Sequence, residues 1–205
     1  LEHMVNTLAT EPLVAGAMAP PAGGHFWQVC HHVAQFHAVL PSRKAGEADW
    51  LANGNAGYSR LLLEELEGFD PGKPIGADTD FVLRARRAGY RPCFEPRSVV
   101  NHDTPRDSAR DAFQYALEHG GTGIRLRAQY RRESRTPRAL CHPATLILGS
   151  PIVAFWVTAR AYARPRMWRW LHLAPVFYVL KMAWCFGAAR ALWVEPAGNT
   201  PTWGR

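Results

Sequence analysis

The sequence lacks any paired-cysteine motif. Its four cysteines lie far apart in the chain, at Cys30, Cys93, Cys141 and Cys185. This spacing argues against a zinc knuckle and against the disulfide framework of a small secreted protein. We therefore expect reduced thiols in a protein that faces the cytosol.

Acidic residues are scarce in the second half of the chain. From Thr122 to Trp170 the only acidic residue is Glu133, whereas the same segment contains Arg125, Arg127, Arg131, Arg132, Arg135, Arg138, Arg160, Arg164, Arg166 and Arg169. The net charge of +7 and the pI of about 9.6 favour an anionic partner. The basic segment has no recognisable nucleic-acid-reading module and borders tryptophan-rich apolar stretches. We therefore expect an anionic membrane surface as the partner, and no nucleic acid.

No internal repeat is evident, and a hydrophobic content of 47% excludes global disorder. We divide the chain into five segments. Residues 1–4 resemble a cloning remnant and are set aside from the fold. The others are an N-terminal segment with one helix (5–45), a compact core (46–104), a basic helical linker (105–140) and a hydrophobic, membrane-associating helical tail (141–205).

Helix and strand patterns alternate quickly in the core, which predicts an α/β fold. Ser59 is expected to cap a helix from Arg60 to Glu67 that ends at Gly68, with Leu61, Leu62 and Leu66 on its buried face. A second helix is expected to begin at Asp78 and end at Gly89, with Phe81, Ala85 and Ala88 as its apolar stripe. The expected strands are Ala48–Ala52, Tyr90–Phe94 and Ser98–Asn101.

The rest of the chain is predicted to be helical. One helix is expected from Phe26 to Leu40, and another from Asp107 to His119, interrupted by Gly120-Gly121-Thr122-Gly123. Two apolar stretches follow, at Ala144–Ala159 and Leu173–Val194, but they contain Pro151, Pro175, Lys181 and Arg190. A charged residue in the middle of a span is costly, so we expect interfacial or re-entrant helices rather than two clean spans. A helical pair packed on the soluble domain is the alternative.

Two motifs stand in a fixed order in the core. The first is Gly54-Asn55-Ala56-Gly57-Tyr58-Ser59-Arg60, followed by Gly68-Phe69-Asp70. The second is Gly76-Ala77-Asp78-Thr79-Asp80-Phe81 with Arg84, followed by Gly89-Tyr90-Arg91, Glu95-Pro96 and His102. The ordered set resembles family 2 glycosyltransferases of the GT-A type. The resemblance covers roughly Trp50 to Asp103 and implies the acceptor-side, C-terminal half of that Rossmann-like fold.

The resemblance implies an inverting transfer of a sugar from a nucleotide-sugar donor to an acceptor hydroxyl. Such a reaction needs a carboxylate that takes the hydroxyl proton, and Asp78 matches the family's base. We expect the helix dipole to favour ionised Asp78 and the neighbouring Asp80 to oppose this. His102 matches a ligand of Mn²⁺ or Mg²⁺, and Trp50, Asn55, Arg60 and Asp80 are expected to shape the pocket. Four of these residues have a structural alternative: Asp78 an N-cap, Trp50 a core residue, Arg60 a solvated helix residue and His102 a structural histidine.

The sequence departs from the family pattern in two ways. Ala77 stands where the family has a glutamate before the base, and we find no N-terminal nucleotide-binding half. The chain is therefore a truncated piece, one part of a split enzyme, or a degenerate relative, and we expect little activity from it alone. The partners expected are a donor-binding chain or a second copy, at the cytoplasmic face of a membrane. The alternative is a non-catalytic pseudoenzyme or partner subunit that docks on a transferase or a membrane.

A cluster of potential metal ligands lies outside these motifs, at His25, Cys30, His31, His32 and His37. His32 and His37 are five residues apart, which is poor geometry for one face of a helix. We interpret this cluster as histidines carried incidentally on a helix.

Overall fold

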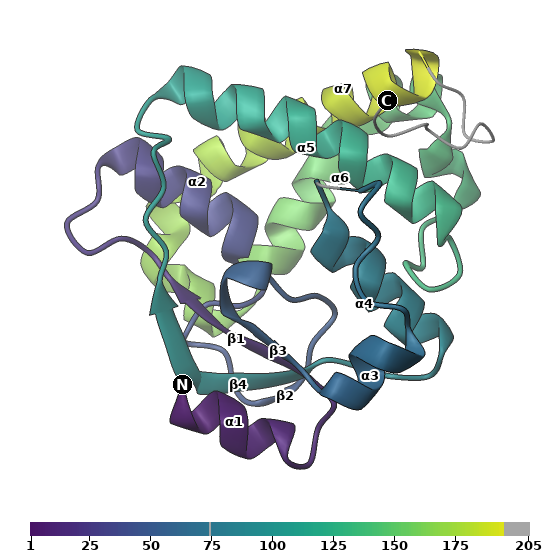
Figure 1. Cartoon of the computed structure of the whole chain (residues 1–205). Coiled ribbons are helices and arrows are strands. Elements are labelled where there is room, and N and C mark those ends of the chain that lie inside the picture. Colours follow the sequence, from purple (N-terminus) through teal and green to yellow (C-terminus); the bar gives the residue numbers. More distant parts are fainter. Residues whose placement is uncertain (74, 195–205) are drawn as a thin grey trace. The chain divides into compact units, whose positions relative to one another are not determined.

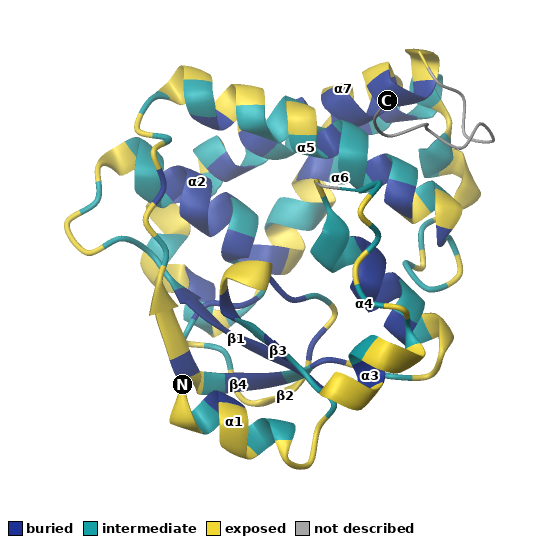
Figure 2. Cartoon of the chain, in the orientation of Figure 1, coloured by how far each residue is buried: buried dark blue, intermediate teal, exposed yellow. Residues whose placement is uncertain are grey.

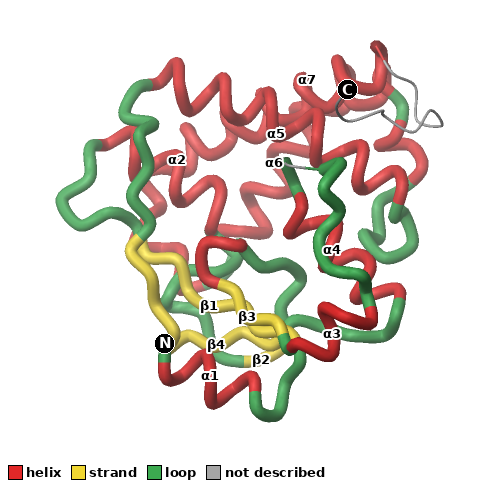
Figure 3. The backbone as a smooth tube through the Cα atoms, in the orientation of Figure 1, coloured by secondary structure: helices red, strands yellow, loops and turns green. Residues whose placement is uncertain are grey.

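A computed structural model describes residues 1–73 and 75–194, and these form two compact units (Figure 1). Unit 1 contains residues 1–22 and 38–102, and unit 2 contains residues 23–37 together with the described chain from 103 onward. Unit 1 carries the sheet, whereas unit 2 is helical (Figure 3). The last residues of the predicted tail, 195–205, lie outside the described residues.

Unit 1 is built on a four-stranded mixed sheet with the strand order β2-β4-β1-β3. The strands are β1 (Leu13–Ala19), β2 (Gly46–Glu47), β3 (Ala56–Tyr58) and β4 (Cys93–Asn101). β4 runs parallel to β1, while β3 is antiparallel to β1 and β2 is antiparallel to β4. This arrangement confirms the expected α/β class, followed by long C-terminal helices.

The central strand β1 lies in a part of the chain where the sequence predicted a helix alone. β1 is buried along almost its whole length, as its dark blue colour in Figure 2 shows. An apolar run of this kind is typical of a central strand covered on both sides. The sequence analysis expected one helix in residues 5–45 and no strand, so β1 was missed, because a short apolar run alone does not identify a buried strand.

Residues 2–8 form a helix, α1 (Glu2–Leu8), that packs on the sheet of unit 1. Met4 is buried, and a side chain at Gly57 of β3 would meet the side chains of both Met4 and Leu8. The first four residues, which the sequence analysis set aside, thus take part in the fold.

The two helices expected in the core are present, with small differences. Ser59 caps α3 (Arg60–Glu65) by accepting a hydrogen bond from the backbone N–H of Leu62, but Leu61 is 78% exposed and only Leu62 of the three leucines is buried. α4 (Ala77–Arg87) buries Phe81 and Ala85 but leaves Ala88 exposed. Helix ends are the part of a pattern that periodicity fixes least.

The strands of the core differ more from expectation. Residues 48–52 form no strand; β2 ends just before them, and the backbone N–H of Ala48 donates to the carbonyl of Pro92. The two strands expected at Tyr90–Phe94 and Ser98–Asn101 are one strand, β4. Its register against β1 shifts between Gly16 and Ala17, where Glu95 and then Val99 are the partners. The intervening residues 96–98 form a bulge.

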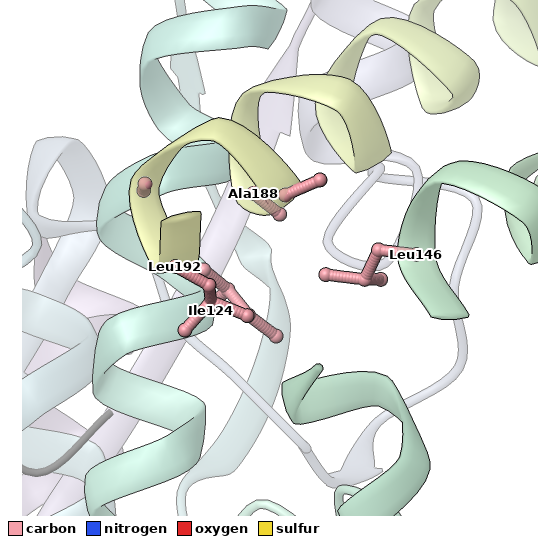
Figure 4. Packing of buried hydrophobic residues seen from close by; sticks show 6 residues of the cluster. Ile124, Leu146, Ala188 and Leu192 are labelled. Atoms are coloured by element: carbon pink, nitrogen blue, oxygen red, sulfur yellow. The ribbon is translucent and has the colours of Figure 1, made fainter. Parts of the chain in front are cut away.

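Unit 2 contains α2 (Phe26–Phe36), α5 (Ala109–Gln129), α6 (Pro143–Tyr162) and α7 (Ala174–Val194). Two short 3-10 helices, η2 (Arg138–Cys141) and η3 (Pro165–Leu173), flank α6. A buried apolar cluster joins α5, α6 and α7 through Ile124, Leu146, Ala188 and Leu192 (Figure 4). The helix expected from Phe26 to Leu40 is present as α2, and it ends at Phe36.

The prediction that Gly120-Gly121-Thr122-Gly123 interrupts a helix is wrong, because α5 runs straight through this segment. The glycines let α7 approach closely instead. A methyl group on Gly120 would lie 2.1 Å from the carbonyl oxygen of Trp184, and one on Gly187 would lie 1.8 Å from that of Leu117. Tertiary packing of the two backbones therefore outweighs the low helix propensity of glycine.

Candidate functional site

Asp78 lies in the first turn of α4, one residue after the helix begins. The N-cap is Gly76, whose φ of 83° is in the left-handed region that glycine adopts readily. The Oδ1 atom of Asp78 accepts hydrogen bonds from the backbone N–H of Thr79 at 2.7 Å and from the Thr79 hydroxyl at 3.3 Å. Asp78 therefore satisfies a first-turn amide of the helix without being its N-cap.

The carboxyl group of Asp78 is held in a partly buried setting. Burial raises its pKa, and it outweighs the opposing hydrogen bonds from the backbone of Thr79 and Asn53. A raised pKa makes a carboxylate a stronger proton acceptor than an exposed one. The backbone N–H groups at the helix start lower this pKa, as expected, but desolvation outweighs them, and Asp80 pairs with Lys73 and Arg84 instead.

Aromatic residues and polar neighbours lie around Asp78. The indole Nε1 of Trp50 donates to the Thr79 hydroxyl at 3.1 Å. The hydroxyl of Tyr58 donates to Oδ1 of Asn53 at 2.5 Å, and its pKa is raised by burial and by the negative charge of Asp78. Tyr58 also packs edge-on against Phe69, with ring centroids 5.2 Å apart. The structure thus brings Trp50 and Asp78 to one place through their shared partner Thr79.

Tyr58, Asn53 and Thr79 were not predicted as site residues. Tyr58 stood inside the first motif and Thr79 inside the second, and these positions were the only available signals. The contact with Asp78 depends on η1 (Asn53–Asn55), a 3-10 turn that leads into β3. Sequence patterns do not place a loop against a helix that begins some twenty residues later.

Asp80 is fully buried and forms two ion pairs. Lys73 Nζ lies 2.5 Å from its Oδ1, and Arg84 Nε lies 2.8 Å from its Oδ2. The other end of the Arg84 guanidinium donates to the carbonyl oxygens of Leu66 and Gly68. These contacts tie α4 to the Gly68-Phe69-Asp70 turn, which explains the spacing of the two motifs. They give Asp80 a structural role at the edge of the site.

Asn55 is buried and bridges two strands of the sheet. Its Nδ2 donates to the carbonyl of Ala17 at 2.9 Å and to that of Ser98 at 2.8 Å. These two carbonyls flank the shift in register between β1 and β4. A side chain on Gly16 would overlap Asn55, which explains the glycine at that position. Asn55 therefore satisfies the backbone groups that the bulge leaves without ladder partners.

The other two predicted site residues are Arg60 and His102. The side chain of Arg60 is 90% exposed and forms an ion pair with Glu64 on the same helix, as a solvated helix residue does. His102 follows the end of β4, and its backbone N–H donates to the carbonyl of Ala19.

The implied Mn²⁺ or Mg²⁺ does not fit the described residues as a complete site. Within residues 1–73 and 75–194, no three or more histidine, cysteine, aspartate or glutamate side chains gather in a way that could hold a metal ion. His102 is therefore a single candidate ligand, and we derive no step through a metal.

The histidines of α2 have structural surroundings in unit 2. His31 and His32 are buried, and the His31 ring meets the Tyr115 ring edge-on at 4.5 Å. The pKa of His37 is lowered to about 3 by burial, which keeps the ring neutral against Phe177. His31 and His32 are therefore interior residues of unit 2, whereas the sequence analysis interpreted the cluster as histidines carried incidentally on a helix.

Comparison with known proteins adds no relative. No family model, no curated protein and no solved structure matches this chain. The resemblance to family 2 glycosyltransferases therefore rests on the ordered motifs alone, and the activity that it implies is a proposal.

Proposed function

We propose that unit 1 is the acceptor side of an inverting glycosyltransferase, with Asp78 as the general base. The observation that supports this most is the partly buried carboxyl group of Asp78, whose raised pKa has burial as its main cause. A base with such a pKa, on the rigid first turn of a helix, suits removal of a proton from an alcohol.

In the proposed step the acceptor hydroxyl attacks the anomeric carbon of the donor sugar. The new carbon–oxygen bond forms as the bond to the nucleoside diphosphate breaks, and the proton of the hydroxyl passes to the Asp78 carboxylate. Backbone hydrogen bonds from Thr79 and Asn53 fix the direction of that carboxylate. We expect the nucleotide to be bound by a donor-binding half outside the residues described here.

The aromatic surroundings of Asp78 support a sugar acceptor. Trp50 is partly exposed and Phe69 is exposed. Tyr58 bonds to Asn53 and packs edge-on against the rings of Phe69 and Phe81. Sugar rings present apolar faces that stack on such side chains, while their hydroxyls need polar partners. The combination of aromatic faces with one basic carboxylate suits a sugar better than a wholly apolar alcohol.

The test is turnover by this chain together with a nucleotide-binding half, supplied either as one longer polypeptide or as a partner chain. We expect nucleotide release from a nucleotide sugar, and a decrease of about 10²- to 10⁴-fold in kcat for Asp78→Asn. Glu64→Gln, an exposed carboxylate of α3, is the control and should retain full turnover. Equal turnover of Asp78→Asn and the unmodified protein would remove Asp78 as the base.

A second function is a non-catalytic subunit that docks on a complete transferase. Ala77, at the position of the family's glutamate, favours this alternative. It predicts stoichiometric binding to a transferase whose turnover does not change when Asp78 is replaced by asparagine. Activity that appears only in the complex and is lost with Asp78→Asn would instead identify a split enzyme.

A further inference from the structure

Helix α6 of unit 2 presents a continuous apolar stripe to solvent. Its exposed positions recur in pairs every four residues, which places them on one face of the helix. They are Ile147, Leu148, Pro151, Ile152, Phe155, Trp156, Ala159 and Arg160. Seven of these eight are uncharged and apolar, the reverse of the polar outer face that a helix on a water-soluble core carries.

The opposite face of α6 is also apolar, and it is the one that packs inside unit 2. Leu146, Ala154 and Ala161 are buried there. Only 22% of the apolar part of α6 is buried inside the structure, so α6 is not a core helix. A helix that is apolar all round and mostly uncovered needs a further apolar environment.

Two hydroxyls within α6 are satisfied by the helix itself. The Ser150 hydroxyl donates to the carbonyl of Ile147 at 2.9 Å, and that of Thr158 donates to the carbonyl of Ala154 at 2.7 Å. Ile147 is the residue whose carbonyl would otherwise bond to the missing N–H of Pro151. The helix therefore continues through its proline, and both hydroxyls have a partner without a hydrogen bond to water.

The stripe ends in a basic and aromatic rim. Arg160 lies over the Trp156 ring with its guanidinium carbon 5.4 Å from the centroid, and Arg169 of η3 lies 4.7 Å from that of Trp170. No aspartate or glutamate lies between Glu133 and Glu195. Tryptophan and arginine at the end of an apolar face are typical of helices that meet anionic headgroups.

We infer that the exposed stripe of α6 docks unit 2 on an anionic lipid bilayer, with the stripe among the acyl chains and the rim of Arg160 and Arg169 at the headgroups. Charge decides between the possible occupants. The same surface of a second copy offers the arginine rim no carboxylate, because none lies between Glu133 and Glu195, whereas an anionic bilayer neutralises the rim. This docking does not depend on the proposed sugar transfer.

The test is co-flotation of the full chain with vesicles of phosphatidylcholine that contain about one third phosphatidylglycerol. Leu148→Glu combined with Phe155→Glu places two charges in the stripe and should lower the partition coefficient at least ~10-fold. Leu61→Glu is the matched control, because Leu61 of α3 is 78% exposed and Leu148 is 81% exposed. Far-UV circular dichroism checks that each variant is folded.

The rim is tested separately. Arg160→Gln and Arg169→Gln should each weaken binding to the anionic vesicles about fivefold and leave the weak binding to pure phosphatidylcholine unchanged. Arg60→Gln, at an arginine that is 90% exposed on unit 1, is the control.

Three outcomes would overturn the inference. The first is a folded chain that does not float with anionic vesicles, and the second is equal flotation of the double glutamate variant. The third is self-association in lipid-free solution that the double variant abolishes while vesicle binding is absent. That result would assign the stripe to a second copy of the chain.

Discussion

Arg84 follows Asp80 by one helical turn on α4, and its guanidinium joins the buried carboxylate of Asp80 to the carbonyls of Leu66 and Gly68. Lys73 approaches the same carboxylate from the loop before the helix. The start of α4, and with it Asp78, is therefore held by charges that are largely removed from water.

Replacing Asp80 should destabilise unit 1 strongly. In Asp80→Ala the partly buried Lys73 and Arg84 lose their shared partner, and we expect a decrease of about 3 kcal/mol in the free energy of unfolding. Glu64→Gln, which breaks the exposed pair with Arg60, should cost less than ~1 kcal/mol. Urea titration followed by circular dichroism measures both, and equal effects would contradict the role given to Asp80.

Replacing Asp78 should have the opposite effect on the free energy of unfolding, because burial disfavours the ionised form of its carboxyl group. Its pKa is raised in the folded state, so the stability that it contributes is present below its unfolded pKa and is lost as the pH rises through the folded value. Asp78→Asn should therefore be more stable than the unmodified chain at pH 7, and the difference should vanish in acid. Denaturant titrations at pH 4 and pH 7 test this.

The pKa of Glu95 is shifted in the opposite direction to that of Asp78. Hydrogen bonds from the Arg97 side chain lower its pKa to about 2. Its contribution to stability is therefore complete above an unfolded pKa near 4.5 and is lost as the pH falls toward 2. Glu95→Gln should lower stability at pH 7, whereas Asp78→Asn raises it. The same sign for both variants would refute the assignment.

Asn55 should matter for stability whether or not it matters for turnover. In Asn55→Ala the carbonyls of Ala17 and Ser98 lose their donor inside the sheet, and we expect a cost of about 2 kcal/mol. Thermal unfolding measures this. A variant as stable as the unmodified chain would show that water reaches the bulge.

Close packing of α5 and α7 makes a prediction in unit 2. Gly187→Ala would place a methyl group 1.8 Å from the carbonyl oxygen of Leu117, and we expect a loss of at least ~2 kcal/mol. Gly149→Ala is the matched control within α6, where an added Cβ meets nothing within 4 Å. That variant should gain about 0.5–1 kcal/mol from helix propensity. Thermal unfolding compares the two.

The sequence predicted the local signals of the fold better than its long-range contacts. Ser59 as a cap, a helix start within one residue of Asp78 and the stop at Gly89 follow from short patterns, and all are present. The central strand β1 was missed, because the burial that distinguishes it from a helix comes from other strands. The glycines of α5 were misinterpreted for the same reason, because their partner is a helix some sixty residues later.

The candidate site divides in the same way. Asp78 and Trp50 could be proposed from the motif, and they share a partner in Thr79. The roles of Asn55 and Asp80 within the fold could not, since they depend on a bulge in β4 and on a loop lysine. A motif residue that holds the backbone and one that faces a substrate look alike in a single sequence.

The glycine contact between α5 and α7 has a consequence for the medium in which unit 2 can exist. Backbone atoms that touch directly are held by dispersion forces, which do not require water to be expelled. A helix pair joined in this way keeps its packing when hydrocarbon replaces water around it. We therefore expect the α5–α7 contact to survive the membrane docking that we infer for α6.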